Sequence, residues 1–103
     1  MNTEELQVAA FEIILNSGNA RSIVHEAFDA MREKNYILAE QKLQEANDEL
    51  LKAHQAQTDL LQEYASGTEI KIEIIMVHAQ DHYMTSQLAR DLIEVLIDVF
   101  ENK

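Results

Sequence analysis

The sequence predicts an all-α fold, in which three long helices form one domain spanning residues 1–103. The chain has no proline and only two glycines, Gly18 and Gly67, so few positions interrupt a helix. Hydrophobic residues make up 47% of the chain, which is too many for a disordered acidic segment. A length of 103 residues allows one hydrophobic core and no second one.

The charge and composition exclude several classes of function. Eight basic residues against 19 acidic ones give a formal net charge of −11, which argues against nucleic acid or an anionic membrane as a partner. The absence of cysteine removes disulfides, thiolate ligands and thiol catalysis. No apolar run reaches the roughly 20 residues of a membrane span, and no signal peptide is visible at the start. We expect a soluble, cytoplasmic protein without direct membrane insertion.

The first helix is expected from about residue 3 to 33. Asn2 or Thr3 can cap it, and Glu5 lies three residues after Asn2, as in a capping box. Apolar and small residues then recur at steps of three and four, which is typical of one buried helix face. These positions are Leu6, Ala10, Ile13, Ser17, Ala20, Val24, Ala27 and Met31.

The phase of this stripe continues across Gly18, which favours one helix with a kink near that residue. Two separate helices remain an alternative. Arg32 and Lys34 suit the negative end of the helix dipole. Asn35 can take the left-handed conformation that ends a helix.

The second helix is expected at residues 36–64. Its heptad stripe is rich in alanine, which lets neighbouring helices approach closely. The stripe consists of Ala39, Leu43, Ala46, Leu50, Ala53, Gln57, Leu60 and Tyr64. The segment from Ser66 to Thr68 ends this helix, and Ser66 with Glu69 forms a second capping-box pattern.

The third helix is expected at residues 69–101. The alternation over residues 70–74 is also typical of a strand, but no other segment offers a pairing partner, so helix is preferred. This helix carries two apolar stripes. One contains Ile75, His78, His82, Thr85, Ala89, Leu92, Leu96 and Val99, and the other Ile74, Val77, Met84, Leu88 and Val95. A bundle of three helices would cover one stripe and expose the other, so we expect self-association.

Residues 76–86, M-V-H-A-Q-D-H-Y-M-T-S, carry the chemistry. His78, Asp81, His82 and Thr85 share one helix face, within an apolar surface where polar groups need partners. Two histidines four residues apart can bind a metal. However, Ala79 stands where a zincin motif requires Glu, and no His in the chain has a Glu three residues before it, as the di-iron motif requires.

Phosphoryl chemistry agrees better with this pattern. A neutral imidazole is a good nucleophile toward phosphorus near neutral pH. A second histidine one turn away can donate a hydrogen bond to the phosphoryl oxygens, as can the Gln80 amide or the Thr85 hydroxyl. A carboxylate such as Asp81 on an apolar stripe must be protonated, paired or metal-bound. If Asp81 faced a symmetry axis, a divalent cation shared by several copies would be the simplest neutraliser. For His25 and His54 a structural role is preferred.

The motif at residues 76–86, with the L-A-R-D-L-I that follows it, resembles the enzyme IIA component of the lactose/cellobiose-type phosphotransferase system. The early F-E-I-I-L-N-S-G-N-A-R-S and the central A-H-Q-A-Q-T are also similar to that family. The resemblance implies an antiparallel three-helix bundle per subunit and a homotrimer of nine helices. It also implies a phosphocarrier that accepts a phosphoryl group from HPr and passes it to a cysteine of its cognate IIB, for uptake of a disaccharide.

By the same resemblance, His78 would be the phosphorylated nucleophile, and His82 and Gln80 would line the phosphoryl site. Asp81 would bind one divalent ion per trimer, expected to be Mg²⁺. Lactose, cellobiose and chitobiose all stay open as substrates. Two other functions remain possible: a non-catalytic helical adaptor, and a protein that binds one metal ion through His78, Asp81 and His82.

Overall fold

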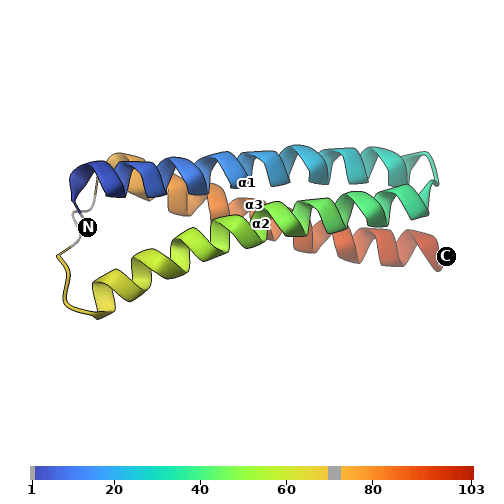
Figure 1. The fold of residues 1–103 in the computed structure, drawn as a ribbon. Helices are drawn as coiled ribbons and strands as arrows, with labels where there is room; N and C mark the ends of the chain where they lie inside the picture. Colours follow the sequence, from blue (N-terminus) through green and yellow to red (C-terminus); the bar gives the residue numbers. More distant parts are fainter. Residues whose placement is uncertain (1, 70–72) are drawn as a thin grey trace.

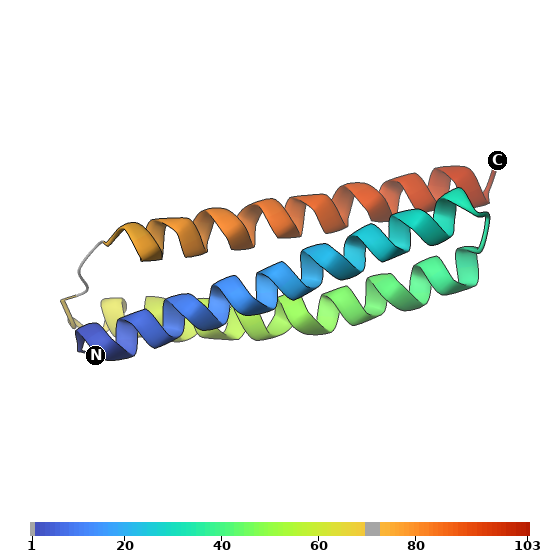
Figure 2. The same ribbon diagram turned by 90° about the horizontal axis from the view of Figure 1, so that it is seen from above.

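The computed structural model describes residues 2–69 and 73–103, and these residues form three long helices. They are α1 (Thr3–Arg32), α2 (Tyr36–Ala65) and α3 (Ile74–Glu101). In Figures 1 and 2, α2 runs antiparallel to α1 and α3, and the C-terminus lies beside the α1–α2 turn. The bundle is elongated, with extents of 51 × 19 × 17 Å. The all-α fold is therefore confirmed for one chain.

Helix α1 lies at the centre of the packing, since it contacts both α2 and α3 over most of its length. All eight positions of its expected stripe are buried. In α2 the expected stripe is buried from Ala39 to Leu60, except at half-buried Gln57. The many alanines in these stripes remove side-chain bulk between the helix backbones, so the helices approach closely and the core stays thin.

Tyr64 does not continue the α2 stripe as expected, because its side chain is 68% exposed. Leu60, one turn earlier, still packs in a cluster with Leu6 and Ala10 of α1. Beyond that point the end of α2 diverges from α1, as Figure 1 shows. The last turn of α2 therefore has no facing helix to cover its apolar side.

Gly18 lies inside one continuous helix, so it does not split α1. Both views show α1 as one continuous helix. The predicted cap at the start of α1 is present, because the Asn2 side chain accepts a hydrogen bond of 2.8 Å from the Glu5 backbone N–H. This bond satisfies one of the free donors at the helix start.

The expected left-handed residue at the end of α1 is wrong by one position. Lys34 has the positive φ of 63°, whereas Asn35 caps α2 by accepting a hydrogen bond from the Leu38 N–H. Asparagine is strongly preferred as an N-cap. Because α2 starts at the next residue, Asn35 serves as its N-cap, and Lys34 occupies the left-handed position of the turn.

The predicted start of α3 at residue 69 is also wrong, because α3 begins at Ile74 after an extended Glu73. The capping box of Ser66 and Glu69 does not form. Ser66 is instead the C-cap of α2, and its hydroxyl donates to the Glu63 carbonyl. Residues 70–72 of the strand-like alternation lie outside the described part of the chain.

The face of α3 that packs in the bundle differs from both expected stripes. Its buried residues are Ala79, Ser86 and Ile97, and Tyr83 and Ile93 pack beside them. No residue of the stripe that runs from Ile75 to Val99 is fully buried. Because α3 is apolar on several sides, its periodicity could not select a face. The small Ala79 and Ser86 permit the closest approach to α1 and α2.

A long apolar surface of α3 is consequently exposed in one chain, and we call it the outer stripe. It consists of Ile74, Val77, Met84, Leu88, Leu92, Val95 and Val99, all more than half exposed. This agrees with the expectation that one chain leaves an apolar stripe uncovered. Among the described helices, none is long and apolar enough to cross a membrane.

Candidate functional site

Two histidines of α3 form the centre of the candidate site. The ring centroids of His78 and His82 lie 5.5 Å apart, and the ring planes are inclined by 46°. His78 is exposed and His82 is half-buried. The i, i+4 spacing on one helix places the two rings next to each other. The chain therefore presents the exposed imidazole of His78 next to the half-buried imidazole of His82.

His82 is held against the backbone of α1. A β-carbon built on Gly18 would lie 3.6 Å from His82 Nε2 and 3.9 Å from Cε1, so the ring rests on the glycine at van der Waals distance. The other ring nitrogen, Nδ1, is buried and has no hydrogen-bond partner among the described residues. A buried nitrogen without a partner is costly, so a water or another polar group is expected to satisfy it.

The sequence reasoning missed Arg21, which α1 contributes to the same site. Its Nη2 donates to the Thr85 hydroxyl and, at 3.4 Å, to the His82 carbonyl oxygen. Arg21 follows Gly18 by one helical turn, so both residues face the same part of α3. The only sequence signal was a basic residue beside the buried stripe of α1, which is too weak to assign a partner 61 residues away.

Gln80 and Asp81 do not join the histidine pair within one chain. The Gln80 amide nitrogen lies 3.8 Å from the Met76 sulfur on its own helix, and Gln80 is half-buried. Gln80 follows His78 by two residues, so on a helix it points to a different face from His78. Asp81 is exposed, and its carboxylate has no ion pair among the described residues. It lies between Val77 and Met84 in the outer stripe.

The other two histidines lie apart from this pair. His54 of α2 reaches α3 through a 3.2 Å contact between its Nδ1 and the Tyr83 hydroxyl. Burial, followed by the negative charge of Asp91, raises the pKa of Tyr83, so the phenol stays protonated at neutral pH. His25 is exposed and lines an apolar groove between α1 and α3. Neither contacts His78 or His82.

The arrangement disfavours a metal ion held by one chain at this site. Among the described residues, the ligand atoms of His78, Asp81 and His82 do not gather within 4.8 Å of one another, whereas those of Glu40, Asp98 and Glu101 do. The latter are exposed acidic side chains, one at the start of α2 and two at the end of α3, and such clusters are common without an ion. Among the described residues, Asp81 is not grouped with two further ligands of its own chain, so a metal ion there would need ligands from elsewhere.

Comparison with known proteins identifies the family of this chain. The family model of the lactose/cellobiose-specific IIA subunit of the phosphotransferase system matches residues 8–101. The chain belongs to this family. It is 43% identical over 101 residues to the lactose-specific EIIA component of Staphylococcus epidermidis, and the match covers 98% of this chain and 97% of that one.

Two solved structures extend the comparison to the fold. The crystal structure of PtcA from S. mutans is 84% identical and has a TM-score of 0.97, covering 98% of this IIA chain and 99% of its own. The second is a solution structure of the IIA(chitobiose)–HPr complex from the N,N′-diacetylchitobiose branch of the Escherichia coli phosphotransferase system. It is 33% identical with a TM-score of 0.77, covering 94% of each chain.

Proposed function

We propose that this IIA chain is a cytoplasmic phosphocarrier, which accepts a phosphoryl group from phospho-HPr on His78 and passes it to a cysteine of its cognate IIB. The flow of phosphoryl groups would drive the uptake and phosphorylation of a disaccharide of the lactose, cellobiose or chitobiose class. The observation that carries the proposal is an exposed imidazole, with a second ring 5.5 Å away, in a chain of this family. The related chitobiose IIA in complex with HPr supports the choice of donor.

The only reacting group that this chain contributes to the two transfers is the His78 imidazole. A lone pair of the neutral His78 imidazole attacks the donor's phosphorus in line with the departing imidazole nitrogen. A nitrogen–phosphorus bond forms on His78 as the one on the donor breaks, and the donor ring keeps the electron pair. In the second transfer a cysteine thiolate attacks the same phosphorus, and His78 leaves. Neither transfer requires a redox reagent.

His82 is assigned the role of stabilising the phosphoryl oxygens. Its ring lies next to His78, and its Nδ1 has no partner among the described residues. When protonated, the His82 ring would donate a hydrogen bond to the negative charge that develops on the transferred group. Gln80 contacts Met76 within its own chain, so its predicted part in the site requires a second subunit or a side-chain rotation.

We further propose that the active form is a homotrimer of nine helices in which copies of α3 meet through their outer stripes. An apolar surface of this length is rarely left exposed by a soluble protein. Asp81 interrupts the stripe, so burial there would require neutralisation of three carboxylates. Oxygen ligands of this kind suit a divalent cation such as Mg²⁺, which would lie on the threefold axis and stabilise the assembly.

The proposed phosphorylation is tested by intact-mass measurement. The native chain and His78→Gln are incubated with phosphoenolpyruvate, enzyme I and HPr, and each mass is compared with that of the untreated chain. We expect one acid-labile phosphoryl adduct on the native chain and none on His78→Gln. His25→Gln is the matched control, because His25 is also an exposed helical histidine but lies apart from the site. It should be labelled normally.

Two outcomes would contradict the proposal. Label on a chain in which both His78 and His82 are replaced would show that the phosphoryl group is carried elsewhere. No label on the native chain, with donors that phosphorylate another IIA protein, would favour a helical adaptor without phosphoryl chemistry.

A further inference from the structure

The proposed mechanism uses only α3, but α1 makes a polar contact with the turn that carries Asp81 and His82. Arg21 Nη2 donates to the Thr85 hydroxyl and lies 3.4 Å from the His82 carbonyl oxygen. Thr85 Oγ1 lies 2.8 Å from the Asp81 carbonyl oxygen and 3.3 Å from that of His82, and its single proton donates to one of them at a time. The guanidinium thereby holds the turn at residues 81–85 to α1.

The same part of α1 also supports the ring of His82. The imidazole lies at van der Waals distance from the position that a β-carbon on Gly18 would occupy. One helical turn of α1 therefore contacts His82 twice, by Gly18 under the ring and by Arg21 at the carbonyl. A half-buried ring with a fixed backbone and a fixed contact surface keeps one orientation.

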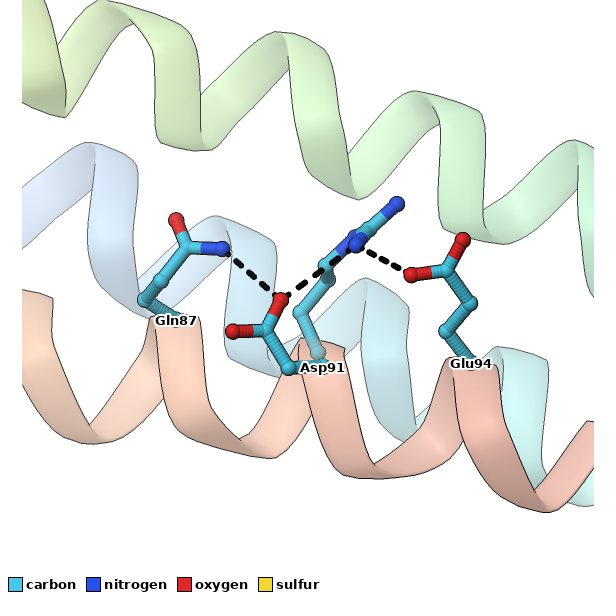
Figure 3. A network of polar contacts seen from close by, with 4 residues as sticks. Gln87, Asp91 and Glu94 are labelled. Atoms are coloured by element: carbon cyan, nitrogen blue, oxygen red, sulfur yellow. Dashed lines mark hydrogen bonds and ion pairs between the residues drawn. The ribbon is translucent and has the colours of Figure 1, made fainter.

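The acceptors of Arg21 are unusual for a cation in such an acidic chain. Among the described residues, Arg21 forms no ion pair, although the net charge is −11. Arg90 shows the ordinary arrangement: its Nη1 lies 3.3 Å from Asp91 and 2.6 Å from Glu94 on its own helix. Gln87 donates to the same Asp91 carboxylate (Figure 3). Arg21 instead uses its directional donors on a backbone carbonyl and a hydroxyl, where geometry matters more than charge.

We propose that Arg21 is a positioning residue for the histidine pair: it holds His82 over Gly18 and beside His78, ready to contact the transferred group. This inference rests on the proposed phosphoryl transfer. Without the guanidinium the α3 turn would shift relative to α1, and the His82 ring would sample other orientations. Misplacing a catalytic group in this way is expected to slow the reaction by roughly tenfold to a hundredfold.

The test compares Arg21→Met with Arg32→Met. Methionine keeps an apolar stem and removes the guanidinium. Arg32 is a matched control, because it is an exposed arginine on the same helix whose guanidinium contacts Asp29 and the Phe28 ring, both within one turn. The phosphorylation rate by phospho-HPr is measured in a single turnover at several HPr concentrations. Arg21→Met should lower the maximal rate at least about tenfold with little change in half-saturation, and Arg32→Met should match the native chain.

A spectroscopic measurement makes the test independent of phosphoryl transfer. The native chain should show a nuclear Overhauser effect between the His82 ring protons and the Gly18 α-protons, as the short distance requires. Arg21→Met should lose this signal while its helical circular dichroism is kept. Thr85→Val should weaken it as well, because it removes the hydroxyl that accepts from Arg21. Thr85→Ser should keep more of the signal and of the rate than Thr85→Val.

The proposal is wrong if Arg21→Met keeps the signal, or if its maximal rate equals that of Arg32→Met. If Arg21→Met does not fold, Thr85→Val decides by the same two readouts. Should the native chain accept no phosphoryl group at all, the proposed function fails. The nuclear Overhauser comparison alone then decides whether Arg21 positions His82.

Discussion

At the scale of single residues, the two glycines of the chain show that one residue type can have opposite effects. Gly18 lies in the interior of α1, where a β-carbon would make ordinary contact with His82. Gly67 has a φ of +97° and open space around it. The first position tolerates a side chain, and the second requires a backbone conformation that L-residues rarely adopt.

We therefore expect Gly18→Ala to raise the free energy of unfolding by about 1 kcal/mol, because alanine is the better helix former. Gly67→Ala should lower the free energy of unfolding by about 1 kcal/mol, because the left-handed backbone disfavours a β-carbon. Urea denaturation of both variants checks the signs. A loss of stability in Gly18→Ala would show that the His82 ring cannot accommodate even a methyl group.

Glu101 gives a prediction for pH. Desolvation, a hydrogen bond with Glu40 and repulsion from Glu40 and Asp98 raise the pKa of Glu101. The folded chain thus holds this proton more tightly than the unfolded chain does. The stability that this proton contributes is fully present below the pKa that Glu101 has in the unfolded chain. It is lost as the pH rises through the pKa that Glu101 has in the folded chain.

Glu101→Gln should accordingly raise the melting temperature at about pH 7 and give no gain near pH 4, where the native carboxyl is largely protonated. Thermal unfolding at both pH values measures this difference. Glu94→Gln is the control. Because Glu94 pairs with Arg90 at 2.6 Å, this substitution should not raise the melting temperature at neutral pH. An equal gain for both variants would mean that only the overall negative charge matters.

At the scale of elements, the two helix ends that precede the turns share one hydrogen-bond pattern. After α1, the Asn35 N–H donates to Ala30 and the Lys34 N–H to Met31. After α2, the Thr68 N–H donates to Glu63 and the Gly67 N–H to Tyr64. Both are Schellman motifs, whose penultimate residue has a positive φ. Glycine occupies that position after α2, and lysine occupies it after α1.

Lys34→Gly should therefore stabilise the chain by about 1 kcal/mol, since it removes the strain of a β-carbon in the left-handed region. The gain should appear as a higher urea midpoint with an unchanged slope. Lys34→Ala removes the same charge and keeps the β-carbon, so it should give no such gain. Equal effects of the two variants would assign the change to charge.

Also at this scale, the three helices differ in how well their sequences predict which residues are buried. Helices α1 and α2 each carry one narrow stripe, and a single stripe has only one way to face a core. The buried positions of both were therefore predictable almost to the end of α2. Helix α3 is apolar on several sides, so its packing face followed from the surfaces of the other two helices and not from its own pattern.

At the scale of the whole molecule, the outer stripe gives a prediction for assembly. If copies of α3 meet there, Leu88→Lys places a charge in the interface and should yield monomers with native helix content. Asp81→Leu adds an apolar residue to the same stripe, so it should keep the trimer and remove any dependence of its stability on Mg²⁺. Sedimentation equilibrium with and without a chelator measures both effects.

Ile37→Lys is the control for that experiment, because Ile37 is a strongly exposed apolar residue on α2, outside the outer stripe. It should sediment like the native chain. Monomers for the native chain itself, or for Asp81→Leu, would contradict an interface at the outer stripe.

The sequence by itself determined the helices, the stripes of α1 and α2, and the histidine pair, because these depend on contacts between residues a few positions apart. The i, i+4 spacing alone places His78 beside His82. Only the tertiary structure decided that Arg21 and Gly18 of α1 hold His82, and which side of α3 is exposed. Those facts depend on how α1 and α3 pack across 61 residues of intervening chain, a relation that no local pattern encodes.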